Sequence, residues 1–111
     1  MILLVALLVG GQAGSEEVPG QRLRAEGDIS GKVSTFTPAK GRSLQALKVE
    51  AIGPDIKRVI IHVSPACSGM VGLFYDGRPS PGQLLRGLPD KKPCYVKVIG
   101  VGTLDLIPVY K

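Results

Sequence analysis

The chain is poor in aromatic residues and lacks two residue types altogether. Among its 111 residues there is no Trp and no Asn, and aromatic residues make up only 5%. Without Asn there is no site for N-glycosylation. With so few rings, a buried core must be built mainly from Val, Ile and Leu.

A single His and two Cys exclude a closed zinc site of the usual kind. Such a site needs four nitrogen or sulfur ligands, and His and Cys together supply fewer. The two cysteines lie far apart in the sequence, so the CxxC motif of a thioredoxin-like redox centre is absent as well. We therefore expect no metal and no cofactor.

The motifs of common enzymes are also missing. There is no GxxxxGK[ST], no GxGxxG and no GxSxG. A triad of His62, Asp76 and either Ser64 or Ser68 can be drawn, but His62 lies in the middle of an expected strand, which is typical of a structural histidine. The acidic residues are scattered and mostly adjoin turns, so no catalytic carboxylate pair is indicated. We expect no enzyme activity.

The residues that are present favour short strands. Hydrophobic residues make up 44% of the chain, as in globular domains, while 15 Gly and 9 Pro favour turns over long helices. Apolar runs separated by turn residues predict about six or seven strands. The expected strands span residues 21–29, 32–37, 44–52, 57–63, 69–75, 93–99 and 103–110.

Alternation within these runs assigns the faces of the strands. Leu44 is expected on the same face as Ala46, with Leu47 and Val49 on the opposite one. Three further faces are expected to be formed by Val59, Ile61 and Val63, by Val71, Leu73 and Tyr75, and by Cys94, Val96 and Val98. The sequence thus predicts an all-β fold, an antiparallel β-sandwich of the immunoglobulin or fibronectin III-like class, as one domain over residues 22–111.

The first residues have the order of a signal peptide. The apolar run 2–9 is followed by small residues, and residues 1–13 form the predicted leader, with cleavage after Ala13 or after Ser15. The run is shorter than the about 20 residues of a membrane span. No basic side chain precedes it, so a buried first strand is the alternative. Residues 14–21 are expected to be a flexible entry, and the protein is expected to be secreted.

The two cysteines fit the same compartment. An even number of cysteines is typical of a disulfide framework in oxidising surroundings. We expect a Cys67–Cys94 bridge, and closing a loop of this length stabilises the fold by about 3–4 kcal/mol in the chain-entropy model. The alternative is a pair of buried free thiols in an intracellular protein.

The net charge of +5 favours anionic partners. An evenly solvated surface that only keeps the domain soluble is the alternative interpretation. Nucleic acid is not expected, because exposed aromatic residues beside the charges are scarce. The candidate residues for binding an anion or a sulfated glycan are Lys40, Arg42, Lys57, Arg58, Lys91, Lys92 and Lys97.

The connection over residues 78–89 is long and rich in Pro, with a short helical turn possible at 83–86. Its leucines either bind a protein or cover the open end of the core. The candidate protein-binding residues of this loop are Arg78, Leu84, Leu85 and Arg86.

Part of the chain resembles a known family. The run from Leu44 to Gly53-Pro54, followed by Val59-Ile60-Ile61-His62-Val63-Ser64-Pro65, is similar in rhythm to a fibronectin type III-like domain. Cys67-Ser68-Gly69-Met70-Val71 and Tyr75-Asp76-Gly77-Arg78-Pro79 resemble secreted domains of the neuron-derived neurotrophic factor type. The buried Trp of such sandwiches is absent, so Met70, Leu73 and Phe74 would have to replace it. The resemblance implies an extracellular adhesion or signalling module without enzyme activity.

The sequence therefore predicts a secreted interaction module that binds an extracellular protein or an anionic glycan through its loops. The alternative is a supporting subdomain of a larger extracellular protein, without a ligand of its own. No membrane span is expected.

Overall fold

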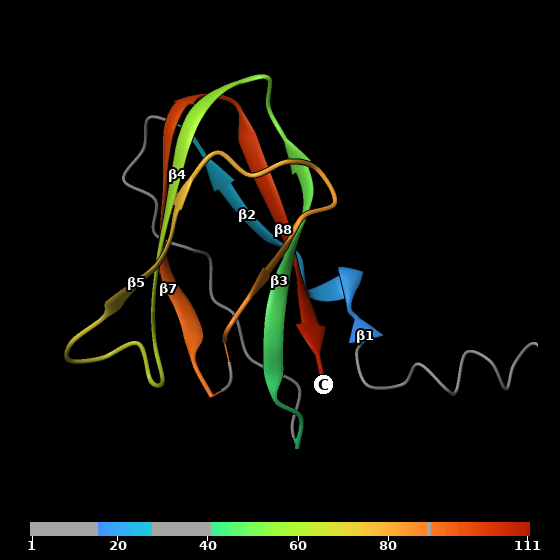
Figure 1. Ribbon diagram of the computed structural model, residues 1–111, viewed down its shortest axis with the longest axis vertical. Coiled ribbons are helices and arrows are strands. Elements are labelled where there is room, and N and C mark those ends of the chain that lie inside the picture. The colour runs from blue at the N-terminus through green and yellow to red at the C-terminus, as the bar shows by residue number, and fades with distance from the viewer. Residues whose placement is uncertain (1–15, 28–40, 89) are drawn as a thin grey trace, which may run out of the picture.

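A computed structural model describes residues 16–27, 41–88 and 90–111. Figure 1 shows a β-structure whose strands form two groups, β4, β5 and β7 on one side and β2, β3 and β8 on the other. The predicted leader, the expected strand 32–37 and Lys40 lie outside the described residues. The elements are β1 (Glu16–Glu17), the 3-10 helix η1 (Pro19–Gln21), β2 (Leu23–Glu26), β3 (Leu44–Ile52), β4 (Asp55–Ser64), β5 (Gly72–Gly77), β6 (Leu84–Arg86), β7 (Lys92–Val101) and β8 (Thr103–Tyr110).

The described strands form two antiparallel sheets, as predicted for an all-β sandwich. Sheet A has the order β1-β8-β3-β6, with β2 also paired to β8, and sheet B has the order β5-β4-β7. The longest strands, β4 and β7, are rich in Val and Ile, which suit a half-buried pleated surface. The two-sheet, sandwich-like architecture is therefore confirmed.

The path of the last two strands differs from that of an immunoglobulin-type domain. There, the last two strands belong to the same sheet. Here β7 lies in sheet B, whereas β8 lies in sheet A between β3 and the N-terminal strands. The strand order of this sandwich therefore differs from that of an immunoglobulin-type domain.

Two connections cross between the sheets at one end of the molecule. β3 leads into β4 through Gly53 and Pro54, and β7 leads into β8 through Gly102 alone. Since β3 pairs with β8 and β4 with β7, the two connections run together, as Figure 1 shows at the top. Gly100 has a φ of +114°, and a Cβ there would lie 2.4 Å from the carbonyl oxygen of Asp55. Only glycine fits this crossing without strain.

The core lies between the sheets and is aliphatic, as the shortage of rings required. Val59, Ile61 and Val63 of β4 are buried, and so is the inward face of β7. The inward direction of Cys94, with Val96 and Val98, is confirmed, since they are only 8%, 1% and 2% exposed. Tyr110 is the one aromatic side chain among the fully buried residues in the described part of the chain.

A β-bulge changes the face of Leu44. The register between β3 and β8 shifts between Leu44 and Ala46. Leu44 therefore packs in the same core cluster as Leu47 and Val49. The predicted grouping of Leu44 with Ala46 is wrong, because one extra residue in a strand reverses the alternation beyond it.

A second bulge, in the pairing of β4 with β5, alters the predicted face of Val71, Leu73 and Tyr75. Phe74 and Tyr75 both pack against the core, whereas Leu73 is 63% exposed. Met70 is 91% exposed. Of the residues expected to replace a buried Trp, only Phe74 packs against the core.

The predicted bridge between Cys67 and Cys94 is present, with its Cα atoms 5.3 Å apart. Cys67 lies in the loop between β4 and β5, and Cys94 lies near the start of β7. Both loop and strand adjoin β4, the central strand of sheet B. The disulfide therefore fastens the β4–β5 loop to the neighbouring strand of the same sheet.

The connection between β5 and β7 contains a strand rather than a helical turn. β6 pairs with β3, and Leu85 lies opposite Leu47 in this pairing. The side chain of Leu85 enters the core. Leu85 is 4% and Leu88 0% exposed, whereas Leu84 points outward and is 37% exposed. Leu85 and Leu88 thus cover the core, and only Leu84 is available at the surface.

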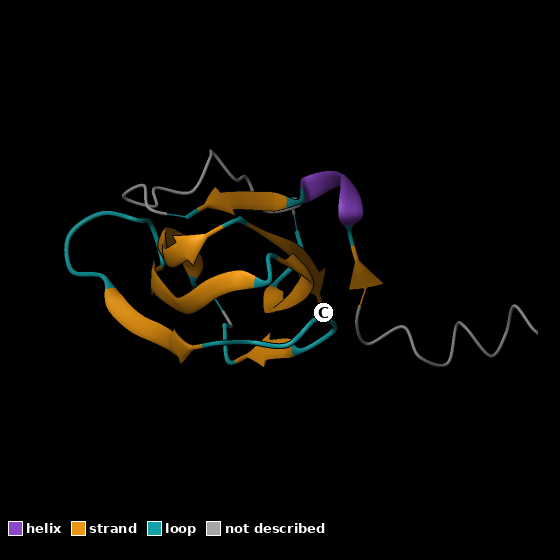
Figure 2. Cartoon of the chain, turned by 90° about the horizontal axis from the view of Figure 1, so that it is seen from above, coloured by secondary structure: helices purple, strands orange, loops and turns teal. Residues whose placement is uncertain are grey.

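Residues 16–21 are held against sheet A, where the sequence predicted a flexible entry. β1 pairs with the end of β8, and the Val18 amide donates to the carbonyl of Pro108 at 3.1 Å. The Tyr110 hydroxyl forms a hydrogen bond with Oε1 of Gln21. Figure 2 shows that η1, drawn purple, leads directly into β2.

Candidate interaction surface

The outer side of sheet A is held together by ion pairs. Each joins the N-terminal segment 16–24, or Arg42 beside it, to a neighbouring element. Their partners lie far apart in the sequence, so they fix an edge of the sheet whose backbone pairing is short. The pairs are Arg22–Glu50, Arg24–Asp105, Arg42–Glu16 and Lys48–Glu17.

These contacts change the titration of one carboxyl group. Arg22 donates to both carboxylate oxygens of Glu50, and this hydrogen bonding, with its positive charge, holds the pKa of Glu50 below its usual value. Arg24 likewise forms a two-pronged contact with Asp105, at 2.7 and 3.1 Å. These four ion pairs therefore neutralise the charges around the segment 16–24.

The outer face of sheet B has a different character. We define it as the side chains of β4, β5 and β7 that point away from the core. Cross-strand pairing places Leu73, His62 and Tyr95 in one row. Leu73 is 63% and Tyr95 46% exposed. The members of the face are Arg58, Ile60, His62, Leu73, Asp76, Tyr95, Lys97, Ile99 and Val101.

The face continues into the β4–β5 loop. Met70, near the end of this loop, is 91% exposed, and Val101 at the end of β7 is 64% exposed. The disulfide joins Cys67 in that loop to Cys94, the residue before Tyr95. The loop and the face are thus covalently fixed to each other, so the loop keeps a defined place beside the row of Leu73, His62 and Tyr95.

Charge on this face is not balanced. Asp76 accepts both of its hydrogen bonds from Arg58 at 2.7 Å, and this contact holds the pKa of Asp76 below its usual value. Lys97, opposite Ile60 in the next strand, is exposed and has no ion-pair partner among the described residues. The face therefore combines apolar side chains and the Arg58–Asp76 pair with one positive charge, Lys97, that has no ion-pair partner among the described residues.

The predicted anion-binding residues do not form a single patch. Lys57 and Arg58 lie near the beginning of β4, and Lys97 lies within β7. Lys91 and Lys92 lie at the beginning of β7, the far end of sheet B from Arg58, which pairs opposite Ile99.

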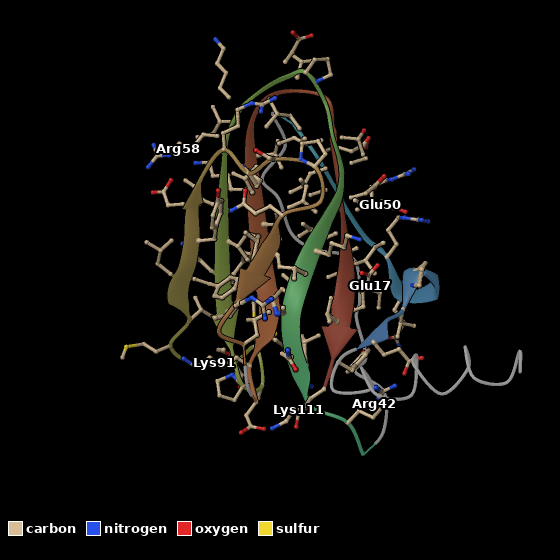
Figure 3. All side chains as sticks on the ribbon, turned by 45° about the vertical axis from the view of Figure 1, so that its right-hand side comes forward. Glu17, Arg42, Glu50, Arg58, Lys91 and Lys111 are labelled. Atoms are coloured by element: carbon tan, nitrogen blue, oxygen red, sulfur yellow. A yellow bond between two sulfur atoms is a disulfide. The ribbon has the colours of Figure 1, made fainter. Side chains whose placement is uncertain are left out.

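Arg42 is engaged by Glu16 and stacks over the ring of Tyr110, 5.3 Å from its centre. It therefore lies at the edge of sheet A, away from the outer face of sheet B. Figure 3 shows Arg58 on the opposite side of the molecule from Glu17 and Glu50.

The predicted protein-binding loop contributes one residue to the core, Leu85, which is buried. Arg78, Leu84 and Arg86 are exposed. Nε of Arg78 is nevertheless engaged within the protein, because it donates to the carbonyl of Ile56 at 2.8 Å. Arg86 lines a pocket of about 400 Å³ together with Ser43, Leu44, Gln45, Gly87 and Lys111.

The sequence contained a signal for the outer face of sheet B. In 57–63 and 93–99, apolar residues occupy both alternating positions, as Ile60, Tyr95 and Ile99 show. Strands of a two-layer sandwich need only one apolar face, so the second is unexplained by burial. Met70 lies in a loop, where no strand alternation exists to indicate that its side chain would be exposed.

Within the described residues, no group of His, Cys, Asp and Glu is arranged to hold a metal ion. No helix in that part of the chain is long and apolar enough to cross a membrane. The chain matches no protein-family model, no curated protein and no solved structure.

Proposed function

We propose that this protein is an extracellular interaction module that docks another protein on the outer face of sheet B. The observation that carries the proposal is the cross-strand row of Leu73, His62 and Tyr95, in which Leu73 and Tyr95 are exposed, with the exposed Met70 beside it. Contiguous exposed apolar residues on a small domain are typical of protein contact sites. Tyr and Met are also enriched at such contacts.

The charge of the face indicates the chemistry of the partner. Lys97 is unpaired in the described structure, and the one acidic group of the face, Asp76, is already held by Arg58. A partner surface with an apolar centre and carboxylates near Lys97 would complement it. A second copy of this chain fits less well, because two such faces would each bring an uncompensated positive charge.

The disulfide supports both the location and the binding role. Disulfides persist mainly in oxidising compartments, which favours an extracellular protein. By fastening the Met70 loop beside Tyr95, the bridge reduces the ordering entropy that binding must overcome. From the fibronectin type III resemblance we retain only the expectation of an extracellular module, given the different path of β7 and β8.

Photo-crosslinking followed by a binding measurement tests the proposal. A photoreactive residue replaces Met70 in the secreted full chain, and the crosslinked protein is identified and purified. Leu73→Ser and Tyr95→Ser should each weaken its binding by about tenfold or more, as expected for central contacts. Lys97→Glu should weaken binding and reduce its dependence on salt.

Leu84→Ser on sheet A is the matched control, because it also removes an exposed leucine. It should leave the dissociation constant unchanged. Equal effects of Leu73→Ser and Leu84→Ser would contradict the proposal. Crosslinks only to other parts of the same polypeptide would instead favour a supporting subdomain of a larger protein.

A further inference from the structure

A pocket of about 400 Å³ lies at the end of sheet A where β3 begins. Its walls come from Ser43, Leu44 and Gln45, and from Arg86, Gly87 and Lys111 across the opening. Two backbone hydrogen bonds fix these walls, from the Lys111 amide to Ser43 at 3.0 Å and from the Leu88 amide to Gln45 at 3.4 Å. The pocket is thus part of the sheet framework rather than of a free loop.

The pocket is electropositive. Arg86 and Lys111 both line it, and neither has an ion-pair partner in the described part of the chain. Among the residues that the structure describes, no acidic residue contributes to its lining. The charged groups of these two side chains attract an anion, and a guanidinium can bind two oxygens of a sulfate or carboxylate at once.

Further cations extend this site across the same end of the molecule. The backbone amide of Lys91 donates a hydrogen bond to the carbonyl of Leu88. The guanidinium of Arg42 donates a hydrogen bond to the carbonyl of Lys111. Figure 3 shows Lys91, Lys111 and Arg42 at one end of the structure. Arg42 is paired with Glu16, whereas Lys91 has no ion-pair partner in the described part of the chain and so adds positive charge at this end. A ligand with anions repeated along its length would contact more than one of these groups.

We propose that this pocket binds one residue of a sulfated glycan, with Arg86 and Lys111 on its sulfate or carboxylate groups. The volume lies in the range of sites for small organic ligands. The exposed backbone of Gly87 offers a surface for the carbon side of a sugar ring. The inference is independent of the protein-docking proposal, because the pocket belongs to sheet A and the docking face to sheet B.

Nucleic acid is a less suitable polyanion for this site. Binding of single strands relies on exposed aromatic rings on which bases stack. Of the aromatic residues near the pocket in the described structure, Tyr110 is 0% exposed beneath Arg42, and Phe74, beside Gly87, packs against the core. A sulfated sugar needs no stacking platform, so the observed groups suit it better.

Isothermal titration of the full chain with a heparin-derived hexasaccharide tests the inference. Arg86→Gln and Lys111→Gln should each weaken binding by about tenfold, the usual effect of losing a hydrogen bond to a charged group. Lys57→Gln is the matched control, since it removes the same charge at the beginning of β4. It should change the affinity less than twofold. In NMR spectra the hexasaccharide should shift the amides of Ser43, Gln45 and Gly87.

Three outcomes would overturn the proposal. Equal weakening by Lys57→Gln and Arg86→Gln would show attraction by net charge alone. Sodium sulfate at the same sulfate concentration giving the same amide shifts and affinity would show an adventitious ion only. A single-stranded oligonucleotide of equal charge that binds as tightly, at the same amides, would assign the site to nucleic acid instead.

Discussion

The crossing of the two sheet-to-sheet connections leads to a quantitative prediction for Gly100. Replacing it with Ala perturbs the molecule in two ways. The backbone stays at a φ of +114°, which an L side chain rarely adopts, and the new Cβ would lie 2.4 Å from the carbonyl oxygen of Asp55 and 2.8 Å from the amide of Lys57. Both neighbours are backbone atoms, so neither can rotate away.

The two contributions have separate magnitudes. A non-glycine residue at such a φ costs about 1–3 kcal/mol. Forcing extra volume into a packed site costs about 1–3 kcal/mol more. Gly100→Ala should therefore lower the free energy of unfolding by about 2–6 kcal/mol. Since small domains are stable by about 5–15 kcal/mol in all, this is a large fraction of the total.

Two control glycines separate these contributions. Gly82 has a φ of +87° but nothing within 4 Å of its added Cβ, so Gly82→Ala should cost only the backbone part, about 1–2 kcal/mol. Gly72 lies in β5 with open space and no positive φ. Gly72→Ala should change stability by about 0.5 kcal/mol or less.

Equilibrium unfolding in urea, followed by far-UV circular dichroism on the oxidised proteins, measures all three variants. The expected order of stability loss is Gly100→Ala, then Gly82→Ala, then Gly72→Ala. If Gly100→Ala and Gly82→Ala lost the same stability, the contact between the two crossing connections would have no energetic weight. The close approach of the two connections at Gly100 would then not explain why glycine occupies this position.

Three other predictions follow from the structure. Because the sequence separation of the bridge is 27, replacing Cys67 with Ser and Cys94 with Ala should cost about 3.5 kcal/mol in the chain-entropy model, with a larger urea m-value. Arg58→Gln should raise the pKa of Asp76, measured by NMR of its carboxyl carbon, because the hydrogen bonds and charge of Arg58 now lower it. Leu88→Ala should cost about 2–5 kcal/mol, because this side chain is fully buried.

Each of these has a contrary outcome. A loss below about 1 kcal/mol without the bridge would mean that the unfolded chain is equally restricted without it. An unchanged pKa of Asp76 in Arg58→Gln would mean that the ion pair does not persist in solution. Leu84→Ala, at an exposed position of the same connection, should cost less than Leu88→Ala, and equal losses would contradict the placement of β6.

The pKa of Asp76 also fixes the direction of a pH effect. A carboxyl group whose pKa is lower in the folded than in the unfolded chain stabilises the fold above its unfolded pKa. That contribution is lost as the pH falls through the folded value. The same holds for Glu50 beside Arg22. Thermal unfolding should thus shift to lower temperature below about pH 4, and Glu50→Gln should reduce that dependence.

The amino-acid sequence determined the strands with strong alternation, the sheet class and the disulfide. Val59, Ile61 and Val63 recur at every second position and are buried together, because successive side chains of a strand point to opposite faces. The bridge was predictable because the chain has two cysteines and one of them lies on an inward face. These features depend on local order along the chain.

The tertiary structure alone decided the features that depend on pairing between distant segments. The bulges that turned Leu44 inward and Leu73 outward arise from register with β8 and β4, which no local pattern encodes. The engagement of Arg42 by Glu16 and the meeting of Arg86 with Lys111 likewise join residues far apart in sequence. Charge and apolarity could be counted in the sequence, but the fold determined which charges were neutralised and which apolar side chains stayed at the surface.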